Sequence, residues 1–95
     1  MAIRRVKFPI GDLGATTEVT EYLRKDWNRL ALLNTLIDKH QSGDWGAVSR
    51  DAAYSNLLSV KNNENITSVY MLDGLPIKVI TSKDRKTTLI TSKVS

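Results

Sequence analysis

The pattern of apolar and polar residues changes its period along the chain, from a helical period to a strand period. Within 27–41, Leu30, Leu33 and Ile37 recur at the spacing of one helix face, with Leu32 and Leu36 beside them. After residue 64 apolar and polar residues alternate, which is typical of half-buried strands. The three alternating stretches are 65–72, 76–82 and 87–94. We therefore expect helices first and an antiparallel sheet afterwards.

Two more helices are predicted, one on each side of the first. Thr16 or Thr17 can begin a helix over 18–25, and Ser49 can begin another over 50–62, because hydroxyl side chains bind the free amides of a helix N-terminus. The other residues expected to bound these helices are Asp26, Gly43 and Asn63. The apolar face expected on the last helix consists of Ala53, Leu57, Leu58 and Val60.

The pair Asp73-Gly74 predicts a two-residue hairpin turn between the first two strands of the sheet. Such a turn pairs Tyr70 with Ile77 and Ser68 with Val79. The face expected to pack on the helices carries Ile66, Tyr70, Leu72, Ile77 and Val79, and the opposite face carries Thr67, Val69, Lys78, Ile80 and Ser82.

An N-terminal strand is predicted over 6–10, because Val6, Phe8 and Ile10 alternate with polar residues and Pro9 suits a sheet edge. The complete prediction is one α+β domain over residues 1–95. It has an N-terminal strand, two to three helices and a three-stranded antiparallel meander, with the helices packed on one face of the sheet.

The amino-acid composition excludes several kinds of chemistry. The 95 residues are 41% apolar and 25% charged, as in an ordinary folded domain, and they contain no cysteine. Disulfides, thiolate nucleophiles and the common zinc frameworks are therefore excluded, and the cytoplasm is the expected location. The basic N-terminus lacks the apolar run of a signal peptide, and we expect no membrane association.

The net charge of +4 is concentrated towards the two ends of the chain. If these ends meet, they form a basic surface that could bind phosphates, nucleic acid or an acidic partner, although lysines on a strand can equally serve to prevent aggregation. The residues of this basic surface are Arg4, Arg5, Lys7, Lys78, Lys83 and Lys86.

His40 is the single histidine, and two roles are open to it. At the end of a helix it can bind free carbonyl groups and interact favourably with the helix dipole. A general base needs an acidic partner, and Asp38, Asp44 or Asp51 could provide one with Ser42 or Ser49 as nucleophile. One histidine does not favour a transition-metal site, and "GDLG" lacks the features of a nucleotide-binding loop, so no cofactor is expected.

Two loops allow both a structural and a binding interpretation. In "SGDWG", Trp45 can pack on the helices or present an exposed platform. In "TSKDRKTT", three basic residues and several hydroxyls can bind phosphate or form a polar turn.

These motifs resemble a family of small proteins carried on bacterial plasmids, phages and integrated elements. The similarity rests on "FPIGDLGATT", "HQSGDWGAV", "ITSVY" and the D-R and T-T pairs near the C-terminus, and it extends over nearly the whole chain. Members often carry the labels "plasmid-related protein" or "type I restriction endonuclease subunit M". The second label does not fit, because this chain lacks the cofactor domain and catalytic loop of a methyltransferase.

The resemblance implies a set of motif residues, without implying whether they form a site or a scaffold. They are His40, Gly43, Asp44, Trp45, Gly46, Asn56, Asp84, Arg85, Thr87 and Thr88. In a structural role, the loop that contains Trp45 would pack under the hairpin, and Asp84 and Arg85 would form a buried pair. Lys78 stands where the family usually has Trp.

Three functions are consistent with these features. The first is a non-enzymatic binding module of a mobile genetic element that binds a host or self protein or a small ligand. A more specific form of this hypothesis has a restriction or CRISPR component of the host as the partner. The second is a nucleic-acid-binding protein or toxin-like ribonuclease, with His40, Arg85 and Lys86 as its candidates. The third is a structural homodimer paired through a sheet edge.

Overall fold

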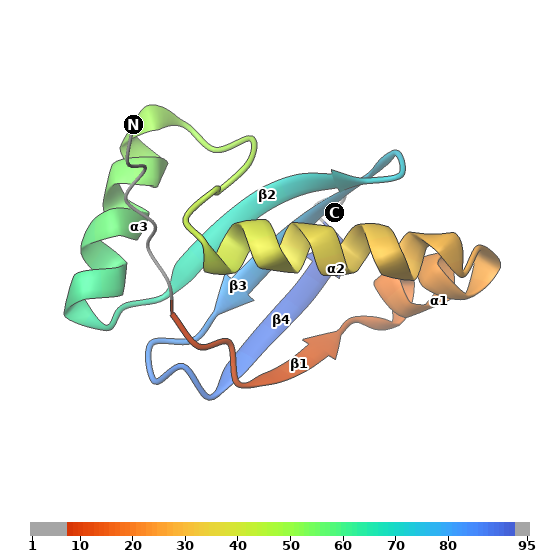
Figure 1. The fold of residues 1–95 in the computed structure, drawn as a ribbon, viewed down its shortest axis with the longest axis horizontal. Coiled ribbons are helices and arrows are strands. Elements are labelled where there is room, and N and C mark those ends of the chain that lie inside the picture. Colours follow the sequence, from red (N-terminus) through yellow and green to blue (C-terminus); the bar gives the residue numbers. More distant parts are fainter. Residues whose placement is uncertain (1–7, 93–95) are drawn as a thin grey trace.

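The structure, a computed structural model, describes residues 8–92 and has the predicted α+β architecture. Helix α2 lies across one face of the sheet, α1 packs at one end of the sheet against α2 and β4, and α3 stands beside the start of β2 (Figure 1). The elements in chain order are β1 (Asp12–Ala15), α1 (Thr17–Lys25), α2 (Asn28–Gln41), α3 (Arg50–Asn62), β2 (Ile66–Leu72), β3 (Leu75–Thr81) and β4 (Thr87–Ser92).

The four strands have the spatial order β1-β4-β3-β2. Strands β2, β3 and β4 form the predicted antiparallel meander, and the predicted pairs Tyr70–Ile77 and Ser68–Val79 are confirmed. The turn at Asp73 and Gly74 has φ angles of 48° and 92°, and positive φ at both positions is what a type I′ hairpin requires.

The position predicted for the N-terminal strand is wrong. Phe8 and Ile10 are outside any strand, Val6 lies outside the described residues, and β1 forms further along, parallel to β4. The chain first turns at Gly11, where φ is 64° and a Cβ atom would lie 2.2 Å from the Lys86 carbonyl oxygen. Only after this turn does the backbone run alongside β4.

The core lies between α1, α2 and the inner face of the sheet. The predicted inner residues Ile66, Tyr70, Leu72, Ile77 and Val79 are all buried, at most 5% exposed. Leu33 and Ile37 of α2 are buried against them, whereas Leu30 and Leu32 are nearly half exposed.

The predicted helix boundaries agree closely with the structure. Ser49 caps α3 by accepting a hydrogen bond from the Ala52 amide at 3.1 Å, and Asp26 accepts one from the Asn28 amide at 3.0 Å. Asn63 ends α3 with φ of 58°. Thr16 occupies the N-cap position of α1 but makes no capping hydrogen bond with its side chain.

The apolar face predicted for α3 is wrong in part. Asn56 and Ser59 are the buried residues of this helix, Leu57 and Leu58 are 47% and 43% exposed, and Ala53 and Val60 are partly buried. The helix turns a small and polar side towards β2 because that side contacts strand backbone.

Candidate functional site

The inner face of the sheet carries a chain of hydrogen bonds centred on His40, which lies in the last turn of α2. Its Nδ1 lies 2.5 Å from Ser68 Oγ, and its Nε2 lies 2.8 Å from Thr81 Oγ1. Thr81 Oγ1 lies 2.7 Å from Thr88 Oγ1, which donates to the Ile10 carbonyl oxygen at 2.8 Å. The chain thus joins α2, all three antiparallel strands and the segment before β1.

The last hydrogen bond of this network determines which group donates in each of the others. A carbonyl oxygen only accepts, so the single hydroxyl proton of Thr88 is committed to Ile10, and Thr88 must accept from Thr81. Thr81 must then accept from His40, which places the imidazole proton on Nε2. Because burial lowers the pKa of His40 to about 4, the ring is neutral near pH 7, and Nδ1 is left as an acceptor for the hydroxyl of Ser68. His40 is therefore a neutral Nε2–H tautomer.

His40 acts structurally in this state. Both His40 and Ser68 are 0% exposed, so no substrate reaches the pair. Burial lowers the pKa of His40 from 6.5 to about 4, because the charged imidazolium is poorly solvated there. The predicted contacts were different: the ring binds strand hydroxyls instead of free helix carbonyls, and its serine partner is neither Ser42 nor Ser49.

Trp45 is buried in the corner that follows α2, so the packing interpretation is confirmed. It is 5% exposed, stacks on Phe8 with ring centroids 6.0 Å apart, and meets the edge of the His40 ring at 6.1 Å. Asp44 accepts a hydrogen bond from the Gly46 amide at 3.3 Å, and its carbonyl accepts one from the Tyr70 hydroxyl.

This corner and Asn56 cover the free edge of β2. The Val69 amide donates to the Trp45 carbonyl at 3.0 Å, and the Ala47 amide donates to the Val69 carbonyl at 2.8 Å. The Asn56 side chain donates to the Thr67 carbonyl at 2.7 Å and accepts from the Thr67 amide at 3.2 Å. Four backbone groups of an edge strand are thereby satisfied, which restricts pairing with another strand. The other edge of the sheet is formed by β1, which is short and exposed.

Arg85 and Asp84 do not form the buried pair that the structural interpretation of the motif described. With φ of 61°, Arg85 directs its guanidinium to carbonyl oxygens at and beyond the end of α3, donating to Ser59 at 2.9 Å and Glu64 at 2.7 Å. Asp84 is exposed and accepts from Ser82 Oγ at 2.6 Å. Hydrogen bonds from Ser82 and from the Lys86 amide lower the pKa of Asp84.

The predicted basic surface is only partly brought together. Arg4, Arg5 and Lys7 lie outside the described residues. Lys83 and Lys86 are exposed in the β3–β4 turn, and Lys78 lies on the outer face of β3. Four of the fourteen basic residues lie outside 8–92 (these three and Lys93), so ten bases and ten acids remain in the described part.

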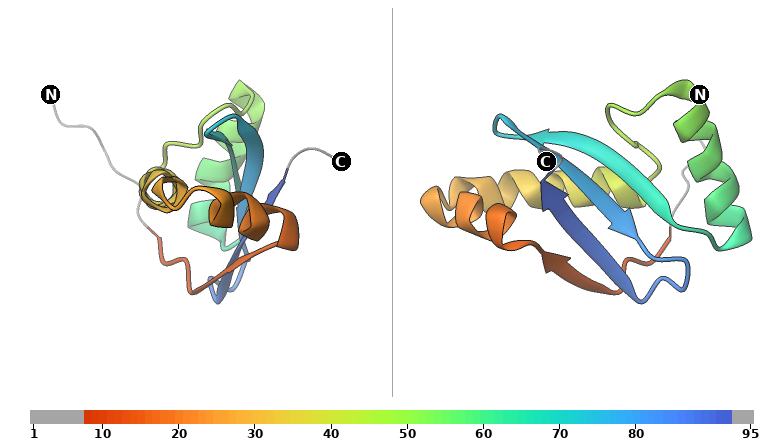
Figure 2. Two further views of the ribbon diagram at one scale, coloured as in Figure 1. Left: turned by 90° about the vertical axis from the view of Figure 1, so that its right-hand side faces the viewer. Right: turned by 180° about the vertical axis from the view of Figure 1, so that it is seen from behind.

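None of the three described helices covers the outer face of the sheet (Figure 2). Met71 and Leu89 are 60% and 44% exposed there. The other outward positions of β2, β3 and β4 are Thr67, Val69, Pro76, Lys78, Ile80, Thr87 and Thr91. Lys78 is the single charged residue of these three strands on this face, and no ion pair joins it to a described acidic residue.

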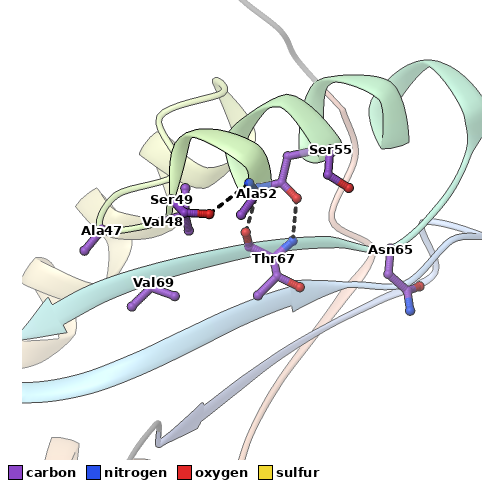
Figure 3. Close-up of a pocket in the computed structure, with 9 residues that line it drawn as sticks. Ala47, Val48, Ser49, Ala52, Ser55, Asn65, Thr67 and Val69 are labelled. Carbon is purple, nitrogen blue, oxygen red and sulfur yellow. Dashed lines mark hydrogen bonds between the residues drawn. The ribbon is translucent and has the colours of Figure 1, made fainter.

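A groove of about 410 Å³ adjoins this face between α3 and β2 (Figure 3). It is lined by Ala47, Val48, Ser49, Ala52, Ser55, Asn56, Asn65, Thr67 and Val69. Its floor is the hydrogen-bonded pair of Asn56 and Thr67, so the motif asparagine shapes the groove while stabilising the strand edge. Sequence reasoning missed this groove, because it depends on the polar side of α3 facing β2.

Comparisons with known proteins found no relative of this chain. No protein-family model, curated protein or solved structure matches the chain, so the resemblance to a mobile-element family stays a prediction. Within residues 8–92, no group of three or more His, Cys, Asp or Glu side chains could hold a metal ion. Among the described helices, none has the length and apolarity needed to cross a membrane.

Proposed function

We propose that this domain is a non-enzymatic binding module and that the outer face of its sheet binds a protein partner. The observation that carries the proposal is this uncovered face, with Val69, Met71, Ile80 and Leu89 around a single charge at Lys78. Apolar surface of this kind is typical of interaction sites. The complementary partner offers an apolar patch with one acidic group opposite Lys78.

The motif residues support the same proposal because of the contacts they already make. His40, Trp45 and Asn56 are buried and bound to the sheet, and Arg85 is bound to carbonyl oxygens near the end of α3. They hold the scaffold in place and leave the recognition to exposed residues. The resemblance to plasmid and phage proteins suggests a host defence protein as the partner.

Nucleic-acid binding is favoured less by the same face. Single-stranded nucleic acids bind sheets through aromatic side chains on which bases stack, together with a basic surface. The outward positions of β2, β3 and β4 carry no aromatic residue, since Tyr70 points into the core.

The test is an affinity capture from nuclease-treated bacterial lysate with the wild-type chain and the variant Met71→Lys, Leu89→Lys. Both side chains are exposed, so the variant should fold. We expect a protein that binds the wild type and a Leu58→Lys control on α3 but is lost with the sheet variant. Purified partner should reproduce the difference by calorimetry. Equal capture by all three chains, or recovery of nucleic acid alone that decreases with salt, would contradict the proposal.

A further inference from the structure

The outward side of α3 carries an apolar stripe that no other part of residues 8–92 covers. Tyr54 is 64% exposed, and Leu57 and Leu58 are 47% and 43% exposed. The helix stands at one end of the molecule, with its other side turned to β2 (Figure 1). Helices ordinarily bury their large apolar residues, so the exposed stripe is the reverse of the usual arrangement.

The spacing of the residues along this stripe is that of a helix–helix seam. Asp51, Tyr54, Leu58 and Lys61 are separated by three, four and three residues, so they lie on one side of the helix. Asp51 and Lys61 are exposed, and they stand at opposite ends of the stripe, about 15 Å apart along the axis.

We propose that α3 pairs with α3 of a second copy of this chain, antiparallel about a two-fold axis. In that arrangement Asp51 faces the partner's Lys61, and Tyr54 faces the partner's Leu58. The stripe is thus complementary to itself in charge and in apolar contact. A two-fold interface repeats every contact, so two ion pairs flank two apolar contacts. The sheet face of the proposed function remains free.

The helix pair is short, so we expect a weak dimer whose population depends on concentration. Sedimentation equilibrium of the full chain over about 10–500 μM should show a weight-average mass that rises from 10.6 kDa towards twice that value. Leu58→Lys should keep the mass at 10.6 kDa throughout. Met71→Lys is the matched control, because it makes the same kind of change on the sheet face and should leave association unchanged.

The antiparallel register of the two α3 helices is tested by exchanging the charges of Asp51 and Lys61. Asp51→Lys should weaken association at least tenfold, and adding Lys61→Asp should restore it, because the opposite charges then face each other again. Circular dichroism checks that α3 remains folded in each variant, and Tyr54→Lys replaces Leu58→Lys if that chain does not fold. A wild-type mass fixed at 10.6 kDa, association unaffected by Leu58→Lys, or no restoration by the double exchange would overturn the proposal.

Discussion

His40 donates its Nε2 proton to Thr81 Oγ1 across 2.8 Å, and neither side chain has any exposed surface. Because the protons run in one direction to the Ile10 carbonyl, the tautomer of the imidazole is fixed by a group on another part of the chain. Every group of this buried polar network is hydrogen-bonded, and such a network favours one arrangement of the strands and α2 over others.

The tautomer can be measured directly, because His40 is the single histidine of the sequence. Long-range ¹H–¹⁵N correlation spectra near pH 7 should show one imidazole, protonated at Nε2, with a slowly exchanging proton. A spectrum of the Nδ1–H form would contradict the proton directions deduced from Thr88.

The stability of the fold should decrease as the pH falls from about 6.5 to about 4. The pKa of His40 is about 4 in the folded protein and close to 6.5 when unfolded, so the unfolded chain binds the extra proton first. The free energy of unfolding should fall by up to about 1.4 kcal/mol per pH unit, and by about 3 kcal/mol in total. Urea titrations of wild type and His40→Gln measure this, since only the wild type should have this additional slope.

Thr81→Val should destabilise the fold by about 2–3 kcal/mol, because it leaves the His40 N–H without an acceptor and removes the donor to Thr88. Thr81→Ser keeps the hydroxyl and should cost about 1 kcal/mol for the lost methyl group. Chemical denaturation compares the two, and equal losses would mean that the hydrogen bonds contribute little.

Asn56→Asp should cost about 2 kcal/mol and release the edge of β2. A carboxylate still accepts from the Thr67 amide, but it cannot donate to the Thr67 carbonyl. Asn65→Asp on the same groove is the control and should change stability little. Hydrogen exchange at Thr67 and Val69 should accelerate in Asn56→Asp alone; unchanged protection would contradict the edge-covering role.

Gly46→Ala and Gly74→Ala should differ strongly although both glycines have positive φ. At Gly46 a Cβ would lie 2.1 Å from the Val69 carbonyl oxygen, so the corner must separate from β2. At Gly74 the nearest atom is 3.7 Å away, and only backbone strain of about 1–2 kcal/mol remains. Thermal unfolding should show the larger loss for Gly46→Ala, and similar losses would contradict the close packing of this corner.

The elements set by local sequence were predictable, and those set by contacts between distant residues were not. Asp73-Gly74 determines its own turn, and with it the register of β2 and β3. The N-terminal strand was misplaced because its position depends on a turn at Gly11 against Lys86. The side of α3 facing β2 was misjudged because Asn56 and Ser59 are buried by bonds to Thr67 and Arg85, which composition does not reveal.

The same distinction between local sequence and contacts between distant residues applies to the candidate site. The residue types of His40 and Trp45 singled them out in the sequence, and the structure shows that both side chains are buried. The structural interpretation of the family motif had Asp84 and Arg85 as a buried pair. The positive φ of Arg85 sends the two side chains to different partners.

The parallel pairing of β1 with β4 has a consequence for the order of folding. The β2–β3 hairpin closes over two residues, whereas β1 must find a partner some 75 residues away, as Asp12 does with Thr87. Long loops close late and at a higher entropic cost. We expect β1 to join the sheet after the rate-limiting barrier, so that changes at Gly11 speed unfolding and leave the folding rate nearly unaltered. The first strand in the sequence would then be the last to fold and the first to detach.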